Sequence, residues 1–418
     1  MQETPSTSTE TAMSLENKID HQSWSGSVSM FNQLQYFDLK SNSLLNPNEA
    51  ILNLPRWNNR AYFILNFKSD TIFEGKLKGQ VRPIIDSNRY NTHVSVITDE
   101  LFLEFPIQKS FLFFGKRNIR DGVGLSFSPT DFLGELKNLE KSKKEEERRI
   151  EREGDDIIGG DFLWENSTLS FIYSPKSDTS QNSARALIKL SKFIPTMNSD
   201  ASIQYFNSKV SGLGANFSTS IKDNIVIYVE SAYRWGHSTH SKISLVQDGR
   251  PRLYSVEPEE NNVSFFDILL GGHYTFKNNA NLIAEYYYHG GGYSQNEWEK
   301  IINFIHYSNN QYKLGLFPEL MSSYLLQANR LMDFGKMKQN YLFLRYSTPH
   351  FLDKTQLSLI GLLDMDDESY LINPYAEYWY LDNLCYSISA YFFNGPTDSE
   401  FGNLNWNSQA ILSVKYLF

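Results

Sequence analysis

The last ten residues of the chain, 409–418, alternate between two kinds of side chain. One face carries Ala410, Leu412, Val414, Tyr416 and Phe418, and the other carries Gln409, Ser413 and Lys415. A period of two is typical of a β-strand with one apolar face. The pattern therefore predicts a strand at the end of the chain.

The same period recurs throughout the sequence. It predicts strands at residues 25–39, 60–68, 73–85, 97–105, 110–117, 157–164, 169–173, 184–193, 201–206, 212–221, 225–235, 265–276, 281–289, 341–347, 356–363, 370–381, 384–393 and 409–418. These are about 18 strands, or about 16 if one hairpin is miscounted, and bacterial single-chain barrels have even strand numbers. We expect an all-β protein, a transmembrane antiparallel β-barrel.

The connections between these strands give a second, independent signal. Short turns at 69–71, 107–109, 164–167, 222–224, 277–279 and 381–383 alternate with long connections at 41–59, 118–156, 236–264, 290–340 and 394–407. Outer-membrane barrels have short periplasmic turns and longer extracellular loops. If Phe418 lies at the periplasmic end, every long connection falls on the extracellular side, so both termini are expected to be periplasmic.

Two of the long connections have helical patterns. Residues 135–153 are highly charged with little apolar face, which favours a solvated extracellular helix, with partner binding as the alternative. Residues 296–338 place apolar side chains at helical spacing. Burial of those side chains would be explained equally by a plug or lid in the barrel mouth and by a loop that caps the rim.

Composition supports a barrel with a narrow lipid-facing band. Hydrophobic residues make up only 41% of the chain, yet aromatic residues reach 15%, as expected for aromatic girdles around a polar lumen. The sequence contains no run of about 18 apolar residues, the length that a transmembrane helix needs.

Residues 1–23 are polar and lack signal-peptide features, so we expect a disordered tail that follows a removed export signal. Residues 24–418 are expected to form one barrel domain with loop insertions at 118–156 and 290–340.

Charge and cysteine content exclude several classes of function. The formal net charge of −9 argues against a nucleic-acid partner. Cys385 is the single cysteine, which excludes an intramolecular disulfide and any multi-cysteine metal or haem site. We therefore expect no cofactor.

Charged residues on the polar strand faces are predicted to line the lumen, because a charge facing lipid costs about 2–4 kcal/mol. They are Lys76, Lys78, Arg82, Arg185, Lys189, Glu230, Arg234, Glu285, Arg345 and Glu377. The cations among them could form a ladder that sets anion preference. Alternatively, they could pair with Glu74, Glu230, Glu285 and Glu377 and stiffen the wall.

Residues 113–133 contain Gly115-Lys116-Arg117 at a strand end and then Ser128-Pro129-Thr130-Asp131. This arrangement resembles the strand-and-loop element of large proteobacterial porin-like barrels, including the alginate-export type, and residues 285–293 and 395–402 look like further elements of such barrels. The resemblance implies a diffusion channel or an exporter. It also implies that Lys116, Arg117 and Arg120 belong to the constriction if this loop folds inward.

The C-terminal strand carries a second resemblance. Phe418, preceded by Tyr416, Val414 and Leu412 at every second position, resembles the signature strand of outer-membrane barrels. The resemblance implies recognition by the barrel-assembly machinery. An ordinary amphipathic edge strand is the alternative.

Enzyme motifs are incomplete. The string from His289 to Gly292 copies an esterase oxyanion-hole motif, but the chain has no Gly-x-Ser-x-Gly. His237 and His240 would need a serine and an acid beside them, and residues 364–368 lack the glycine and distal glutamate of a calcium loop. We expect no enzyme activity.

The predicted function is an outer-membrane channel that passes polar or charged solutes. The expected partners are outer-membrane lipid and lipopolysaccharide, the barrel-assembly machinery and a polar or anionic solute. A periplasmic or surface protein is a further expected partner. The alternatives are a barrel that sheathes or anchors an electron-transfer or secretion partner, and a surface hydrolase.

Overall fold

A computed structural model describes residues 24–72, 75–134, 153–175, 183–237, 241–258, 262–332 and 334–418. The tail predicted at 1–23, the charged segment 135–152 and His240 lie outside these ranges. Every structural statement below refers to the described residues.

Eighteen strands form one sheet. They are β1 (Trp24–Leu39), β2 (Trp57–Ile72), β3 (Gly75–Asn88), β4 (Thr92–Ile107), β5 (Ser110–Arg117), β6 (Asp155–Trp164), β7 (Ser167–Ser174), β8 (Arg185–Ile194), β9 (Ser199–Asn207), β10 (Val210–Ile221), β11 (Ile225–His237), β14 (Asn262–Thr275), β15 (Asn281–His289), β16 (Asn340–Leu352), β17 (Thr355–Asp364), β18 (Tyr370–Leu381), β19 (Leu384–Asn394) and β20 (Trp406–Leu417). Each pairs antiparallel with its neighbour in this order, and β20 pairs with β1. The barrel is closed, and the predicted strand count is confirmed.

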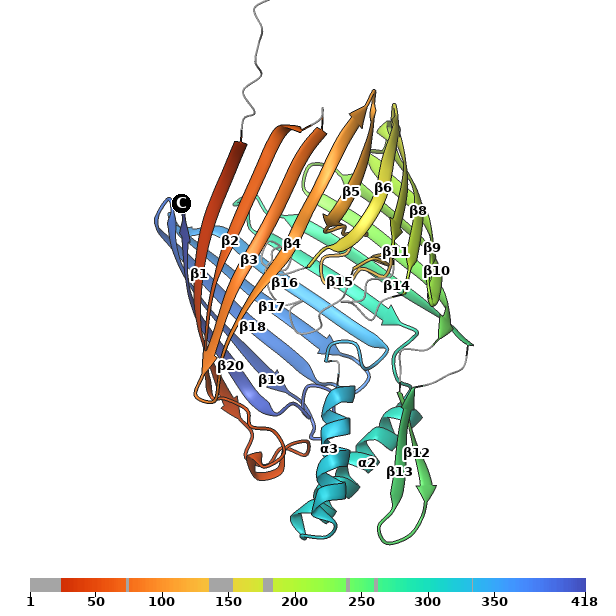
Figure 1. Cartoon of the computed structure of the whole chain (residues 1–418), viewed down its shortest axis with the longest axis vertical. Coiled ribbons are helices and arrows are strands. Elements are labelled where there is room, and N and C mark those ends of the chain that lie inside the picture. Colours follow the sequence, from red (N-terminus) through yellow and green to blue (C-terminus); the bar gives the residue numbers. More distant parts are fainter. Residues whose placement is uncertain are drawn as a thin grey trace, which may run out of the picture.

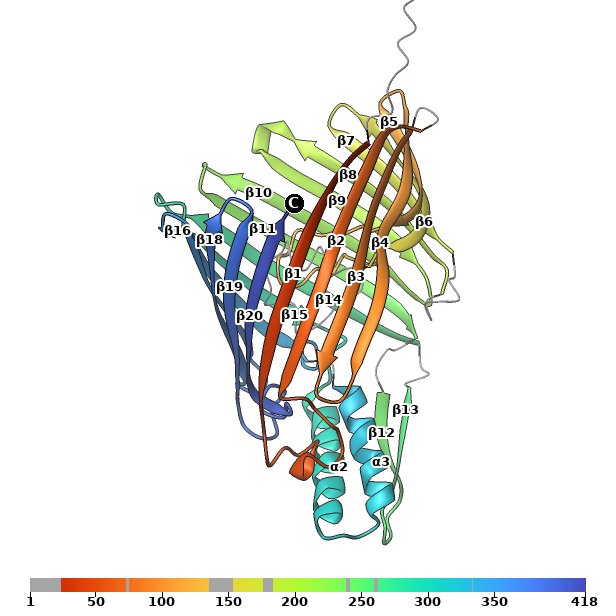
Figure 2. The same cartoon turned by 60° about the vertical axis from the view of Figure 1, so that its left-hand side comes forward.

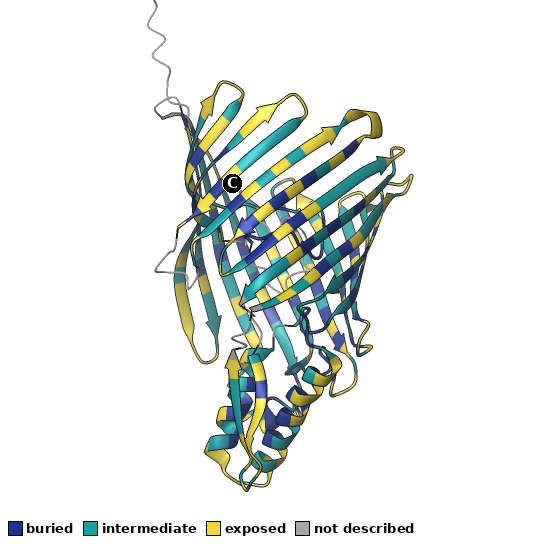
Figure 3. Ribbon diagram, turned by 90° about the vertical axis from the view of Figure 1, so that its right-hand side faces the viewer, coloured by how far each residue is buried: buried dark blue, intermediate teal, exposed yellow. Residues whose placement is uncertain are grey.

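The two faces of the barrel wall differ as the period of two requires. On β6 and β9 the outward side chains Ile158 and Ile203 are each 62% exposed, while the inward Ile157 and Phe206 are buried. Figure 3 shows the resulting alternation of buried and exposed positions along the strands. The exposed side is a continuous apolar belt, which is the surface that a lipid-embedded barrel needs.

A folded extension stands beyond the barrel at the end opposite the C-terminus (Figures 1 and 2). It contains the hairpin β12 (Ser241–Gln247) and β13 (Leu253–Pro258), the helices α2 (Gln295–Lys313) and α3 (Pro318–Leu331), and the 3-10 helix η1 (Pro47–Glu49). A second 3-10 helix, η3 (Pro195–Met197), lies in the β8–β9 turn. We call residues 40–56, 241–258, 293–337 and 395–405 the cap.

The cap has its own apolar core. It includes Trp298, Ile301, Ile305, Met321 and Tyr324, with Leu45 contributed by the β1–β2 loop and Ile243 by the hairpin. The apolar residues predicted at helical spacing therefore pack against other outer loops, and the helices extend away from the barrel mouth. The hairpin β12–β13 was missed by the sequence prediction, which placed a long connection at 236–264 without strands in it. No helix among the described residues is both long and apolar enough to span a membrane.

Candidate channel constriction

The loop that follows β5 folds into the barrel, where Glu230 on the inner face of β11 holds it. The backbone N–H groups of Val123 and Gly124 donate to Glu230 Oε2 at 2.8 and 3.0 Å. The backbone N–H and the hydroxyl of Thr130 donate to Oε1 at 2.7 and 2.6 Å. Glu230 is completely buried. One carboxylate thus satisfies three backbone donors that would otherwise be buried without partners.

A second carboxylate, Glu285 on β15, holds the middle of the same loop. The N–H groups of Leu125 and Ser126 donate to its two oxygens at 2.6 and 2.7 Å, and the Ser126 hydroxyl also donates to Oε2. Tyr228 donates its hydroxyl to Oε1 at 2.5 Å. Residues 118–134, which we call the constriction loop, are therefore attached to strands far from β5.

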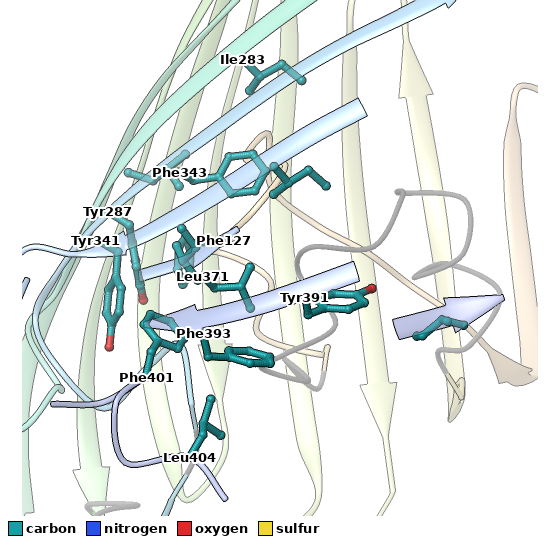
Figure 4. Close-up of a cluster of buried hydrophobic side chains, with 14 of the residues drawn as sticks. Phe127, Ile283, Tyr287, Tyr341, Phe343, Leu371, Tyr391, Phe393, Phe401 and Leu404 are labelled. Atoms are coloured by element: carbon teal, nitrogen blue, oxygen red, sulfur yellow. The ribbon is translucent and has the colours of Figure 1, made fainter. Parts of the chain in front are cut away.

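Aromatic contacts add to these bonds. Phe127 stacks on Tyr287 of β15 with ring centroids 4.3 Å apart, and Figure 4 shows it among inward side chains of the neighbouring strands. Phe132 stacks on Phe206 of β9 at 5.2 Å. At Gly212 on β10 a Cβ would come within 2.6 Å of the Phe132 ring. The missing side chain at Gly212 makes room for the loop.

Most of the predicted cationic ladder fastens this loop or pairs within the wall. Lys189 binds Asp121 at 2.6 Å, Arg234 donates to Pro129 O at 2.6 Å, and Arg185 donates to Leu133 O at 3.2 Å. Arg82 forms a buried two-point ion pair with Asp99 at 2.9 and 3.0 Å. For these residues the structure favours the interpretation in which the charges stiffen the wall.

Lys76 and Lys78 lie on the inner face of β3, on the wall facing away from the loop's anchors. Lys78 is the cross-strand neighbour of Lys68, and Lys76 is the neighbour of Glu104, which also binds Lys78 at 3.3 Å. Three lysines thus occupy neighbouring positions of β2 and β3, and one of them, Lys78, binds Glu104. The sequence analysis did not include Lys68 among the lumen residues, although the alternation along the predicted strand at 60–68 indicates which face its side chain occupies.

The remaining predicted lumen residues are placed as follows. Arg117 lies over the rings of Phe102 and Phe113 at 5.1 and 4.2 Å, and Arg120 donates to Gly124 O within the constriction loop. Arg345 is on the inner face of β16, and Glu377 on β18 accepts from Tyr375 at 2.7 Å. Lys116 is the cross-strand neighbour of the exposed Leu101, so it faces outward and its assignment to the lumen was wrong.

The lumen wall is less polar than the sequence suggested. Inward residues of β15 to β20 form an apolar cluster with the constriction loop, including Ile283, Phe343, Ile360, Leu362, Leu371, Tyr391, Phe393 and Ile411. Below the loop, Gly122 and Val123 border a cavity of about 420 Å³ with residues of the β6–β7 turn and of β8 to β10. The interior therefore has an apolar side and a basic side.

The other sequence candidates do not assemble a second site. Leu412, Val414 and Phe418 are exposed on the outside of the C-terminal strand. His289 Nδ1 lies 2.9 Å from Asp267 on β14 and 3.2 Å from the hydroxyl of Tyr287. No cluster of metal-ligating side chains occurs in the described part of the chain.

Glu400 connects the cap to the barrel. It accepts from Met337 N at 3.4 Å and from the Tyr341 hydroxyl at 2.6 Å, and it also accepts from Gly335 N. Burial raises the pKa of Glu400 to about 7. Since the folded pKa exceeds the ordinary one, the stability contributed by this group is complete below the ordinary pKa and is lost as the pH rises through about 7.

We expect the attachment at 334–337 to be cut faster by protease at about pH 8.5 than at about pH 5.5, with rates normalised to an unfolded control. The Asp364 carboxyl interacts with Glu400 in the same buried site, so E400Q alone should weaken this pH dependence and D364N/E400Q should abolish it. Equal pH dependence in the wild type and in D364N/E400Q would contradict the assignment to this pair of carboxyls.

A scan against protein-family models finds no match, and a search of curated proteins finds none either. Solved structures do match. OccAB1 of Acinetobacter baumannii has a TM-score of 0.57 at 8% identity, over 94% of this chain and 96% of that one. Pseudomonas aeruginosa OccK5 (OpdH) gives 0.55 at 11% identity over 94% and 98%, and OprD gives 0.52 at 10% over 94% and 95%. At such low identity these similarities show the fold alone, an 18-stranded barrel of the kind found in Gram-negative outer-membrane porins.

Proposed function

We propose that this protein is an outer-membrane channel through which polar solutes diffuse, with a preference for anions. The observation that supports this most directly is the constriction loop, which is fastened inside a closed barrel by Glu230 and Glu285. A barrel does not need an internal loop to be stable in lipid. A channel that selects among solutes does need a narrowed interior, which such a loop provides. The lysines of β2 and β3 supply the charge of the filter.

The other assignments follow from this one. The cap faces the outside of the cell and the termini face the periplasm, and residues 24–418 act as one barrel domain without enzyme activity. Kinship with alginate-export barrels is supported by the sequence resemblance of residues 113–133, with 285–293 and 395–402 as further elements. The exposed side chains of Leu412, Val414 and Phe418 suit recognition by the barrel-assembly machinery, and the apolar belt suits contact with lipid and lipopolysaccharide. A sheath around a partner protein is disfavoured because the constriction loop occupies the interior.

The test is ion selectivity in planar bilayers. A unit charge about 7 Å from a permeating ion contributes roughly 0.6 kcal/mol in water. Each lysine lowers the energy of an anion and raises that of a cation, so removal of both charges changes the difference between the two ions by roughly 2.4 kcal/mol. K76Q/K78Q should therefore lower the anion-to-cation permeability ratio by roughly 50-fold at low salt, and by less at high salt. K116Q removes an outward lysine and is the matched control, for which we expect no change.

Unchanged selectivity in K76Q/K78Q would refute the anion filter. Absence of any conductance from a correctly folded, heat-modifiable barrel would refute the channel and favour a role in anchoring a partner.

A further inference from the structure

A cavity of about 390 Å³ lies at the cap end of the barrel, where the chain leaves β1 and β19 and enters β20. It is lined by Lys40, Ser41, Asn42, Ser43, Leu44, Phe393, Asn394, Gly395, Thr397, Gly402, Asn403, Leu404 and Asn407. This volume falls in the range of small-molecule sites, roughly 300–1,000 Å³. The cavity is separate from the constriction and from the lysines of β3.

The lining is neutral and rich in hydrogen-bonding groups. It combines amide and hydroxyl side chains with the partly exposed apolar side chain of Leu44, and no carboxylate lines it. Lys40 is the only cation in the lining; it donates to Gly402 O at 2.6 Å, and burial lowers its pKa. The cavity therefore suits a ligand recognised through hydroxyl groups more than one recognised through charge.

Asn403 sets this cavity apart. Its side chain is 2% exposed, and within the described residues neither Oδ1 nor Nδ2 has a hydrogen-bond partner. Burial of such an unsatisfied group costs about 1–3 kcal/mol. Asn405, two residues later, has its amide fully engaged: Oδ1 accepts from Ser43 Oγ at 2.7 Å, and Nδ2 donates to Asn329 Oδ1 at 2.9 Å. The Asn403 amide thus lowers the stability of the fold and forms no hydrogen bond within it, which points to a ligand.

We propose that this rim cavity binds a neutral saccharide ring, with the amide of Asn403 bonded to two adjacent hydroxyls. A primary amide offers a donor and an acceptor side by side, and each sugar hydroxyl can both donate and accept. No internal hydrogen bond opposes rotation of the Asn403 side chain towards the ring. The partly exposed Leu44 supplies apolar surface on which the C–H face of a sugar packs. Free solutes and surface lipopolysaccharide both offer such a ring, since the chemistry is shared.

The test compares binding with stability in the purified barrel, refolded in detergent without lipopolysaccharide. Isothermal titration would use methyl α-glucoside, methyl α-galactoside and maltose as probes. The variant Asn403→Leu keeps the volume and loses no internal hydrogen bond, so its unfolding midpoint should equal or exceed that of the wild type. Its saccharide affinity should fall about tenfold or more. The control Asn405→Leu breaks two internal bonds and should lower the unfolding midpoint.

Three results would overturn the proposal. They are no saturable binding of any probe by the wild-type protein, unchanged affinity in Asn403→Leu, and a loss of stability in Asn403→Leu as large as that in Asn405→Leu. A separate titration uses the oligosaccharide of delipidated lipopolysaccharide as the probe. Binding of that oligosaccharide alone assigns the site to surface lipopolysaccharide, and binding of the simple glycosides assigns it to a solute. Because binding is measured without conductance, failure here is distinguishable from failure of the channel assignment.

Discussion

Replacement of Glu230 and Glu285 together by glutamine should enlarge the single-channel conductance. The two carboxylates accept bonds from the backbone N–H groups of five loop residues, Val123, Gly124, Leu125, Ser126 and Thr130. A hydrogen bond to a charged group contributes about 1.5–3 kcal/mol, and a glutamine has one oxygen where the carboxylate has two. If about 3 kcal/mol of docking energy is lost, the undocked population of the loop rises by about 100-fold or more.

The measurement is conductance in planar bilayers, accompanied by a heat-modifiability assay to show that the barrel is intact. Larger and noisier current steps in E230Q/E285Q are expected, together with faster proteolysis within residues 118–134. E377Q is the matched control, because it removes an inward carboxylate that does not hold the loop. Wild-type conductance in the double variant would mean that the loop does not limit the pore.

The strands could be predicted from sequence because their signal is local. Each needs only a period of two over about ten residues, and the alternation of short and long connections fixed the hairpin order. The hairpin β12–β13 was not predicted from the sequence, because its exposed apolar residues, such as Leu245 and Val246, do not face a barrel interior. Its stability comes from Ile243 and Tyr254 packing on the helices of the cap, which is a tertiary effect.

The constriction was only partly predictable. Strand parity placed Glu230 and Glu285 on the inner face, but nothing local shows that a carboxylate accepts bonds from a loop about 100 or more residues away in sequence. Lys116 was assigned to the lumen because its motif resembles that of porin-like barrels. The register between β4 and β5 instead places Lys116 opposite Leu101, on the outer face. The orphaned amide of Asn403 has no sequence signal, because satisfaction of a buried group depends on its neighbours in space.

Arg82 provides the sharpest contrast with its neighbours on β3. Its guanidinium and the Asp99 carboxylate are 7% and 1% exposed, and two hydrogen bonds join them. Arg82→Met leaves Asp99 charged and buried without its cation, and breaking such a pair costs about 3–5 kcal/mol. The double variant R82M/D99N removes both charges and should recover most of that loss. Urea unfolding of the refolded barrel measures both effects.

Anion selectivity of R82M/D99N should stay close to that of the wild type, because the Arg82–Asp99 pair has no net charge and its removal changes none. If R82M/D99N instead lost anion preference, Arg82 would belong to the filter together with Lys76 and Lys78. The pairing seen in the structure would then not be the state that governs permeation. The two readouts separate a charge that stabilises the wall from a charge that acts on the solute, although strand parity places both on the same face.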